Sequence, residues 1–176
     1  MSTFPPKRVD LVLIGTRGQV GSALRRRLAA QAPRLRASAG LDLRLLATFD
    51  RRGFAWDLAG LDPARVESQL RSRAEGDIGA LLTTLARPTA TPVVIVDCTA
   101  SEAIADAYPD WLGAGHAVAT ANKRANARDL AFYADLQRLS ARHAAPYHYE
   151  TTVGAAIPLL GPLRNLALRG ERVLKV

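Results

Sequence analysis

Short runs of apolar residues alternate along the chain with longer segments in which apolar positions recur every three or four residues. The first run, at 9–14, is rich in β-branched residues and ends at a glycine, a pattern typical of a buried strand. Leucines and alanines then recur at helical spacing over 21–36, where Pro33 leaves the end of the helix open. Residues 41–49 predict a second strand, and residues 50–61 are expected to form a loop.

The rest of the chain continues this alternation. Asp62 and Pro63 favour a helix start, as cap and first helical residue, and a second helical piece is expected after Gly76. Ser101, followed by two acidic residues, predicts the start of another helix. The remaining expected elements are strands at 93–98, 116–120, 147–149 and 171–176 and helices at 126–144 and 157–169. Alternating strands and helices predict an α/β fold, a doubly wound, Rossmann-like parallel sheet with helices on both faces.

Composition restricts the class of protein. With 48% hydrophobic and 23% charged residues and no apolar run long enough to span a bilayer, the sequence predicts a soluble globular domain and no membrane partner. The first residues are polar and proline-bearing, unlike a signal peptide, so we expect a cytoplasmic protein. A single cysteine, Cys98, and three histidines exclude a disulfide framework and a zinc cluster.

The net charge of +8 raises nucleic-acid binding as an alternative. Of the 24 cations, 21 are arginines, and they are dispersed along the chain. The densest group, at 25–27, falls inside the first predicted helix, from which these arginines are expected to extend into water. We therefore expect no nucleic-acid partner.

A glycine-rich turn with GxxGxxG spacing, GTRGQVG at 15–21, joins the first predicted strand to the first predicted helix. Gly15 permits a tight turn, Gly18 lets the backbone approach a diphosphate, and Gly21 lets the helix pack closely on the sheet. The helix N-terminus adds free N–H donors and a positive dipole. We predict that this turn binds the diphosphate of a dinucleotide, with a plain tight turn as the alternative. The predicted contacts are Gly15, Thr16, Arg17, Gly18, Gln19, Val20 and Gly21.

Charged residues follow the second predicted strand. There a carboxylate, Asp50, would take the ribose hydroxyls of an adenosine, whereas Arg51 and Arg52 would favour a 2′-phosphate. Two arginines against one acid favour NADP, although NAD stays open, and a solvated cluster of loop charges is the alternative. Asp50 and Arg51 are the predicted cofactor contacts.

Two further segments follow predicted central strands, at the carboxyl ends where ligands of open α/β sheets bind. In the first, Thr99, Ala100 and Ser101 are predicted cofactor contacts, with helix capping as the alternative for the two hydroxyls. Neighbouring Cys98 is expected to be a buried structural thiol, because no activating base is close to it in sequence.

In the second segment, Asn122 and Lys123 follow the predicted strand at 116–120. Lys123 is one of three lysines in an arginine-dominated chain. An ammonium at this place can donate to a carbonyl oxygen or carry a proton, which a guanidinium does poorly. An exposed loop lysine is the alternative.

Three stretches, met in order along the chain, carry a family resemblance. They are VDCTAS at 96–101, TANKRAN at 120–126 and YETTVGAAIP at 149–158. Together they resemble the nucleotide-binding half of homoserine dehydrogenase, including the module found in bifunctional aspartokinase enzymes. The sequence departs from the usual family form by an extra residue between its glycines and by alanines at 121 and 156.

The resemblance implies interconversion of L-homoserine and L-aspartate 4-semialdehyde, small-molecule substrates of threonine and methionine biosynthesis, by hydride transfer with NAD or NADP. It also implies a homodimer in the full-length enzyme. Lys123 would be the catalytic residue, helping proton transfer or polarising the aldehyde oxygen, and Asn122 and Thr99 would lie beside the nicotinamide and its ribose. A monovalent cation, sodium or potassium, would be held by Glu150 and the backbone carbonyls of Val153, Ala155 and Ile157.

The resemblance further implies a division of the chain. Residues 1–156 are expected to form the NAD(P)-binding domain, and residues 157–176 to begin a truncated substrate and dimerisation domain. The chain is then expected to bind cofactor but to catalyse little, because hydride transfer needs the substrate held close to the nicotinamide. Two alternatives remain: a noncatalytic dinucleotide-binding module, and another amino-acid pathway reductase such as a dihydrodipicolinate reductase.

Overall fold

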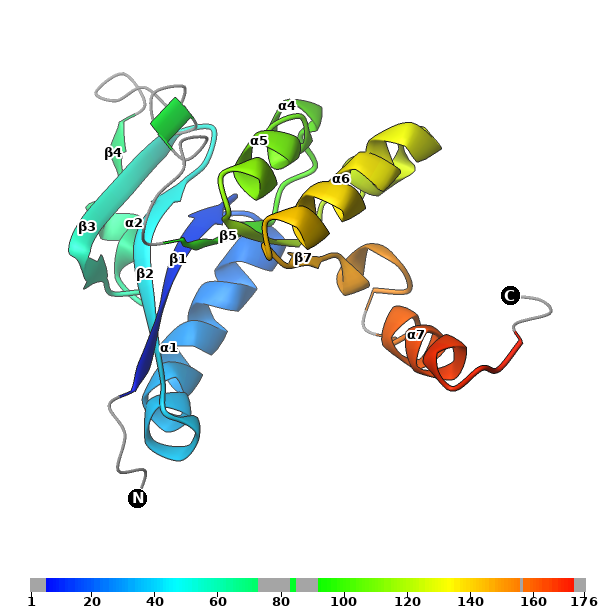
Figure 1. Cartoon of the computed structure of the whole chain (residues 1–176). Coiled ribbons are helices and arrows are strands. Elements are labelled where there is room, and N and C mark those ends of the chain that lie inside the picture. Colours follow the sequence, from blue (N-terminus) through cyan, green and yellow to red (C-terminus); the bar gives the residue numbers. More distant parts are fainter. Residues whose placement is uncertain (1–5, 73–82, 85–91, 156, 173–176) are drawn as a thin grey trace.

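A computed structural model describes residues 6–72, 83–84, 92–155 and 157–172 of the chain (Figure 1). Within them, seven strands form one sheet in the order β4-β3-β2-β1-β5-β6-β7. The strands are β1 (Lys7–Ile14), β2 (Leu41–Phe49), β3 (Gly53–Leu61), β4 (Arg71–Ser72), β5 (Val94–Asp97), β6 (Ala117–Thr120) and β7 (Tyr147–His148). β3 runs antiparallel to both of its neighbours, and the other neighbouring pairs are parallel. Because β2 and β5 flank β1, the direction of winding switches between β1 and β5.

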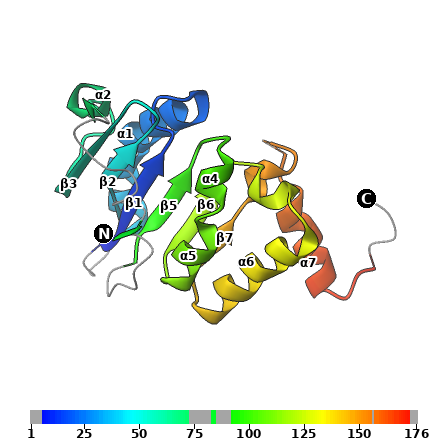
Figure 2. The ribbon, with the colours of Figure 1, turned by 90° about the horizontal axis from the view of Figure 1, so that it is seen from above.

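Helices cover both faces of the sheet, as Figures 1 and 2 show. The long α1 (Gln19–Ala39) lies on one face, and α5 (Tyr108–Gly113) and α6 (Leu130–Arg142) lie on the other. The shorter elements are α2 (Val66–Gln69), α4 (Glu102–Ala105), α7 (Leu160–Leu168) and the 3-10 turns η2 (Ala125–Ala127) and η3 (Glu150–Thr152). The predicted doubly wound, Rossmann-like α/β class is therefore confirmed, with one antiparallel strand that was not expected.

Two apolar cores lie on opposite faces of the sheet. Val12 and Ile14 of β1 belong to the core shared with α5 and α6, whereas Leu11 and Leu13 belong to the core that includes residues of α1. This alternation follows from the two-residue period of a strand. Trp111 of α5 is fully buried in the first core. Burying a large apolar side chain contributes roughly 1.5–3 kcal/mol, so both faces of β1 stabilise the fold.

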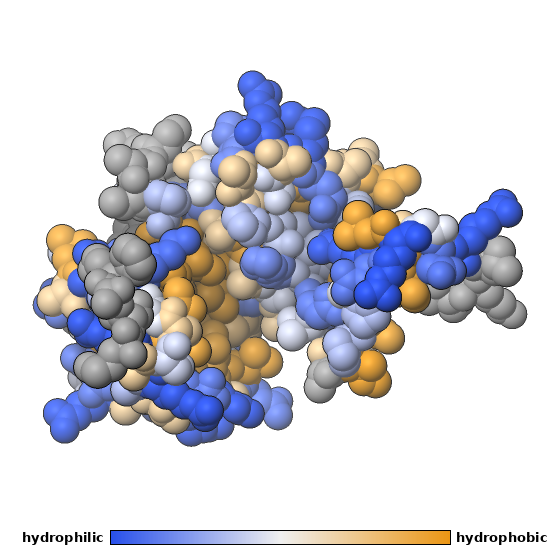
Figure 3. Space-filling model, turned by 60° about the horizontal axis from the view of Figure 1, so that its bottom comes forward, coloured by the Kyte–Doolittle hydropathy of each residue, from blue (hydrophilic) through white to orange (hydrophobic). Residues whose placement is uncertain are grey.

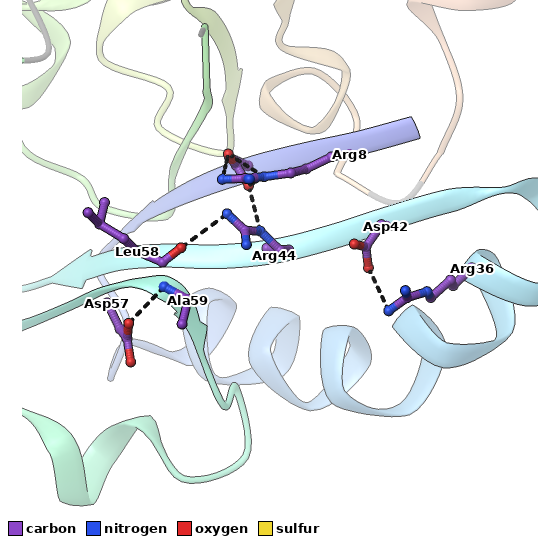
Figure 4. Close-up of polar contacts among 8 residues, drawn as sticks. Arg8, Arg36, Asp42, Arg44, Asp57, Leu58 and Ala59 are labelled. Atoms are coloured by element: carbon purple, nitrogen blue, oxygen red, sulfur yellow. Dashed lines mark hydrogen bonds and ion pairs between the residues drawn. The ribbon is translucent and has the colours of Figure 1, made fainter. Parts of the chain in front are cut away.

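Charged side chains join the first three strands near the amino end of β1 (Figure 4). The carboxylate of Asp10 accepts hydrogen bonds from Arg8, on the same strand, and from Arg44 of β2 at 3.0 Å. Arg44 also donates to the carbonyl of Leu58 in β3 at 3.1 Å. These contacts connect β1, β2 and β3 near the strand ends that lie opposite to the glycine-rich turn.

Figure 3 shows one face of the molecule, where apolar side chains gather in a central hollow and hydrophilic side chains surround it.

In the described part of the chain, every helix is too short or too polar to cross a membrane.

The segment 50–61, expected to be a loop, contains β3. The carboxylate of Asp50 accepts the backbone N–H groups of Arg52 at 2.8 Å and Gly53 at 3.2 Å, so the chain reverses direction and pairs with β2. The loop prediction is wrong because the large apolar residues Trp56 and Leu58 are 62% and 71% exposed, so hydrophobicity does not mark the buried side of this strand.

Helix starts and ends also differ from the predictions. Asp62 accepts the N–H of Ala64 in a local turn, and α2 begins later, at Val66. The helix expected from residue 126 begins at Leu130, because the cap is the carboxylate of Asp129. Pro33 lies inside α1, which continues to Ala39.

Two C-terminal elements and one central element complete the comparison. The helix expected at 157–169 is α7. Of the strand expected at 171–176, Glu171 and Arg172 are in neither helix nor strand, and the remaining residues lie outside the described part of the chain. The helical piece expected after Gly76 also lies outside it.

Candidate functional site

Four segments that the sequence singled out meet at one edge of the sheet. β1 pairs with β2 and β5, and β5 pairs with β6, so that Ile14, Phe49, Asp97 and Thr120 lie side by side in register. The glycine-rich turn, Asp50, residues 98–101 and residues 121–123 follow these four residues directly. The structure therefore brings the predicted cofactor contacts together at the switch point of the sheet.

The glycine-rich turn needs glycine for steric reasons at two positions. Gly15 has φ of +88°, a conformation that side chains disfavour, and its N–H donates to the carbonyl of Phe49 at 2.8 Å. A Cβ on Gly21 would lie 2.1 Å from the carbonyl oxygen of Gly15. The predicted tight turn at Gly15 is confirmed, and Gly21 allows α1 to approach the backbone of the turn closely.

The turn opens the N-terminus of α1. Gly18 is the helix cap, and the first turn of α1 has neither an acidic residue nor a side-chain cap. Arg17, Gly18, Gln19 and Val20 are exposed, whereas the side chain of Thr16 is fully buried. Unpaired amides and a positive dipole end at an exposed, glycine-lined turn are suited to holding a diphosphate.

Arg25 holds the turn from beneath, contrary to the expectation that it extends into water. Its side chain is 6% exposed. It donates to the carbonyl of Thr16 at 3.0 Å, to the carbonyl of Pro63 at 3.2 Å, and to the carboxylate of Glu67. One guanidinium thus ties the turn to the segment that contains α2. The sequence signal for this position was its helical spacing of four from Gly21, which places it on the buried side of α1.

Asp50 is bound by Arg17 of the turn. Arg17 Nε lies 2.6 Å from Asp50 Oδ2, and Nη2 lies 2.5 Å from Oδ1. Burial alone would raise the pKa of Asp50, but the hydrogen bonds from Arg17 and from two backbone N–H groups together lower it below its usual value. The same carboxylate raises the pKa of Arg17. The predicted contact Arg51 is exposed beside this pair.

A buried polar cluster lies beneath the ends of β5 and β6, and the sequence alone did not predict it. Asp97 is fully buried. Its Oδ2 accepts from the hydroxyl of Tyr108 at 2.5 Å and from Asn122 Nδ2 at 2.9 Å, and its Oδ1 accepts from the N–H of Thr99 at 2.8 Å. Burial, and next the negative charge of Asp97, raise the pKa of Tyr108, which therefore stays a hydroxyl donor. The available sequence signal was an aspartate placed directly after a run of β-branched residues.

The predicted contacts at these strand ends differ in exposure. Asn122 is buried, and its amide also donates to the carbonyl of Ser101 at 2.8 Å. Lys123 and Ala100 are exposed, and Thr99 is half-buried. The hydroxyl of Ser101 accepts the N–H of Ile104 and caps α4, which confirms the capping alternative for that residue.

Cys98 is half-buried and carries a protonated thiol. Burial, followed by the charge of Asp97, raises its pKa to about 12. A thiol with this pKa is a poor nucleophile at neutral pH, in agreement with the structural role expected for it.

The loop that contains Glu150 lies beside the end of β6. Thr151 Oγ1 donates to the carbonyl of Thr120 at 3.0 Å. Glu150 Oε1 accepts the N–H groups of Leu160 at 2.9 Å and Gly161 at 3.2 Å, so this carboxylate caps α7. The other predicted cation ligands follow on the same exposed loop: Val153, Ala155 and Ile157. Among the described residues, no three side chains of His, Cys, Asp or Glu gather into a metal-binding group.

Comparison with protein families and curated proteins gives a consistent match. The family model described as "Homoserine dehydrogenase, NAD binding domain" matches residues 17–150. Bifunctional aspartokinase/homoserine dehydrogenase 2, chloroplastic, of Zea mays is 34% identical over 161 residues, which cover 90% of this chain and 18% of that protein. Bifunctional aspartokinase/homoserine dehydrogenase 2 of Escherichia coli (strain K12) is 30% identical over 171 residues, covering 97% of this chain and 21% of that protein. The chain thus spans about a fifth of the length of these relatives.

Solved structures share the fold. A Candida auris protein described as being of unknown function superposes with a TM-score of 0.76 at 28% identity, over 95% of this chain and 45% of that one. A hyperthermophilic archaeal homoserine dehydrogenase in complex with NADPH superposes with a TM-score of 0.72 at 23% identity, over 89% of this chain and 48% of that one. These matches do not favour a dihydrodipicolinate reductase. The family resemblance of the three sequence stretches is confirmed, and the chain belongs to the homoserine dehydrogenase NAD-binding domain family.

Proposed function

We propose that the chain is the dinucleotide-binding part of a homoserine dehydrogenase, which interconverts L-homoserine and L-aspartate 4-semialdehyde. The observation that carries this proposal is the meeting of the glycine-rich turn, Asp50 and the Asn122–Lys123 segment at one switch point. A bound nicotinamide dinucleotide supplies the hydride chemistry, and the protein binds and orients it.

The proposed cofactor site follows the sheet edge. The diphosphate would lie at the turn 15–21, where the N-terminus of α1 is exposed and Gly18 carries no side chain. The adenosine would lie toward Asp50, and the nicotinamide toward the strand ends that carry Thr99 and Asn122. Ala100 and Ser101 complete the proposed contacts on that side.

We favour NADP over NAD as the cofactor. Both oxygens of Asp50 are already bound by Arg17, so the carboxylate is less free to accept from ribose hydroxyls. Arg17, Arg51 and Arg52 place positive charge around the same point, which suits a 2′-phosphate.

Lys123 is the proposed catalytic residue. Its exposed ammonium follows Asn122, which is fixed by buried hydrogen bonds, so its backbone position is held while its side chain faces solvent. In this place it would donate a hydrogen bond to the aldehyde oxygen or take up the hydroxyl proton.

A monovalent cation at Glu150 is a further part of the proposal. Glu150 Oε1 already accepts hydrogen bonds from the N–H groups that begin α7. A cation would therefore be held through Oε2 and the carbonyls of Val153, Ala155 and Ile157. Such a set of oxygens is suited to sodium or potassium.

The proposal extends to the whole enzyme. Residues 1–156 would form the cofactor domain, and residues 157–176 would begin the substrate and dimerisation domain of a cytoplasmic homodimer in threonine and methionine biosynthesis. Support comes from the exposed apolar residues of this segment: Ile157, Leu166 and Leu168 are 61%, 43% and 85% exposed, surface that further structure would bury.

Binding of the cofactor tests the proposed function directly. The chain is titrated with NADPH and NADH, and binding is followed by nicotinamide fluorescence and by the shift of the melting temperature. A ligand that binds the native state raises its stability, so both readouts should change at millimolar ligand or below. No change with either dinucleotide refutes the proposal.

A further inference from the structure

Asp97 is a buried carboxylate with an unusual set of partners. Its side chain has no exposed surface, and each side-chain hydrogen bond that the described residues give it comes from a neutral donor. A carboxylate is costly to bury, and it is retained where its hydrogen bonds fix a particular arrangement. The arrangement fixed here lies directly beneath the proposed nicotinamide end of the cofactor site.

This side chain joins three separate segments. Thr99 belongs to the loop after β5, Asn122 to the loop after β6, and Tyr108 to α5, and all three donate to Asp97. In the described chain, none of its side-chain hydrogen bonds reaches the glycine-rich turn or Asp50. The direct side-chain hydrogen bonds of Asp97 therefore lie in one half of the proposed site.

The position of Lys123 depends on the same contacts. Asn122, on one side of it, is held by Asp97, and the N–H of Arg124, on the other side, donates to Asn122 Oδ1 at 3.1 Å. The N–H of Asn122 also donates to Thr120 Oγ1 at 2.8 Å, and that hydroxyl is hydrogen bonded to Tyr108 at 2.7 Å. Removing the hydroxyl of Tyr108 would therefore loosen both the carboxylate and the backbone before Lys123.

Resting on the proposed function, we propose that Asp97, held by Tyr108, is a positioning residue for the nicotinamide half of the dinucleotide. It fixes the loops after β5 and β6 as one surface, and with them Thr99, Asn122 and Lys123. The adenosine half is bound by other residues and does not depend on it.

The test compares whole cofactors with their adenosine halves, on the chain itself. Dissociation constants are measured by calorimetry for NADPH and 2′,5′-ADP, and in parallel for NADH and ADP, with the unaltered chain, Tyr108→Phe and Asp97→Asn. Tyr133→Phe is the matched control, because it also removes a phenolic hydroxyl that bonds a neighbour, here Tyr149 at 2.6 Å. Tyr108→Phe keeps the aromatic packing, so it tests the proposal even where Asp97→Asn fails to fold.

The expected result is a selective loss. Tyr108→Phe should weaken binding of the whole dinucleotide about tenfold or more and leave binding of the adenosine half within about twofold, while Tyr133→Phe changes neither. Equal weakening of both ligands, or no weakening, overturns the role of Asp97 and leaves the proposed function standing. Equal affinity of the unaltered chain for the whole dinucleotide and its half also overturns it. Failure of the unaltered chain to bind any of the four ligands overturns the proposed function, and this inference with it.

Discussion

The guanidinium of Arg17 donates two hydrogen bonds, of 2.6 and 2.5 Å, to the carboxylate of Asp50, which follows it by 33 residues in the sequence. The pair joins the glycine-rich turn to the end of β2. Arg17 of the turn therefore neutralises the negative charge of Asp50. The positive charges of the neighbouring Arg51 and Arg52 remain.

Removing the guanidinium should change the choice of cofactor. Arg17→Gln frees Asp50 to accept from ribose hydroxyls and removes positive charge beside a 2′-phosphate, so affinity for NADPH should fall about tenfold relative to NADH. The ratio of the two dissociation constants is the measurement. Arg8→Gln is the matched control, because it breaks an Arg–Asp pair at the opposite end of β1. A ratio that is the same in Arg17→Gln and in the unaltered chain would contradict the role of this pair.

Acid should remove the stabilisation that the pair provides. The pKa of Asp50 is lower in the folded chain than its usual value, so the contribution is present above the usual aspartate pKa and is lost as the pH falls through the lower folded one. Between about pH 5 and about pH 2, the free energy of unfolding of the unaltered chain should therefore fall more than that of Asp50→Asn. The difference should not exceed about 1 kcal/mol, because both side chains are partly exposed. If the free energy of unfolding falls by the same amount in both chains over this pH range, the pair does not provide this stabilisation.

Lys123→Ala should depress turnover and spare cofactor binding. In the complete enzyme, loss of a proton-transfer group lowers kcat by about 100-fold or more, while the dissociation constant for NADPH stays within about twofold. Lys7→Ala, which removes an exposed lysine at the far end of β1, is the control and should change neither. A normal kcat in Lys123→Ala removes the catalytic role.

Arg25→Gln should destabilise the fold strongly. It removes a buried cation that holds the carbonyls of Thr16 and Pro63 and the carboxylate of Glu67, so the free energy of unfolding should fall by about 2–4 kcal/mol. The neighbouring Arg26 is exposed, and Arg26→Gln should change the free energy of unfolding by less than about 0.5 kcal/mol. Denaturant unfolding measures both, and equal effects would mean that the contacts of Arg25 contribute little.

Glu150 can be tested for two roles at once. Glu150→Gln keeps an oxygen acceptor for the N–H groups of Leu160 and Gly161, whereas Glu150→Ala removes the cap and should cost about 1 kcal/mol of stability. If the carboxylate also holds a cation, the activity of the complete enzyme should respond to sodium or potassium over a bulky organic cation, and Glu150→Gln should abolish that response. An unchanged response in Glu150→Gln would leave Glu150 as a helix cap alone.

The sequence predicts the centre of this molecule better than its edges. The strand predicted at 41–49 coincides with β2, because it is a largely apolar run bounded by Gly40 and Asp50. β3 was not predicted because two of its large apolar residues, Trp56 and Leu58, face solvent. The start of α6 was predicted too early because local spacing does not reveal which of two polar residues caps it.

The candidate site shows the same division. The turn at Gly15 and Gly21 was predictable, because backbone geometry there follows from local sequence. The burial of Arg25 and the bond from Tyr108 to Asp97 were not, because each joins elements whose distance depends on the packing of the whole sheet.

Among the described residues, few contacts attach α7 to the rest of the fold. No residue of α7 is fully buried, and its orientation depends on the packing of Leu160 against the core, on the cap from Glu150 and on the hydrogen bond from Arg164 to Tyr149 at 2.7 Å. The capping loop is fastened in turn to the carbonyl of Thr120. A displacement of the end of β6 would therefore also move the N-terminus of α7, because the loop at 149–151 connects the two through hydrogen bonds.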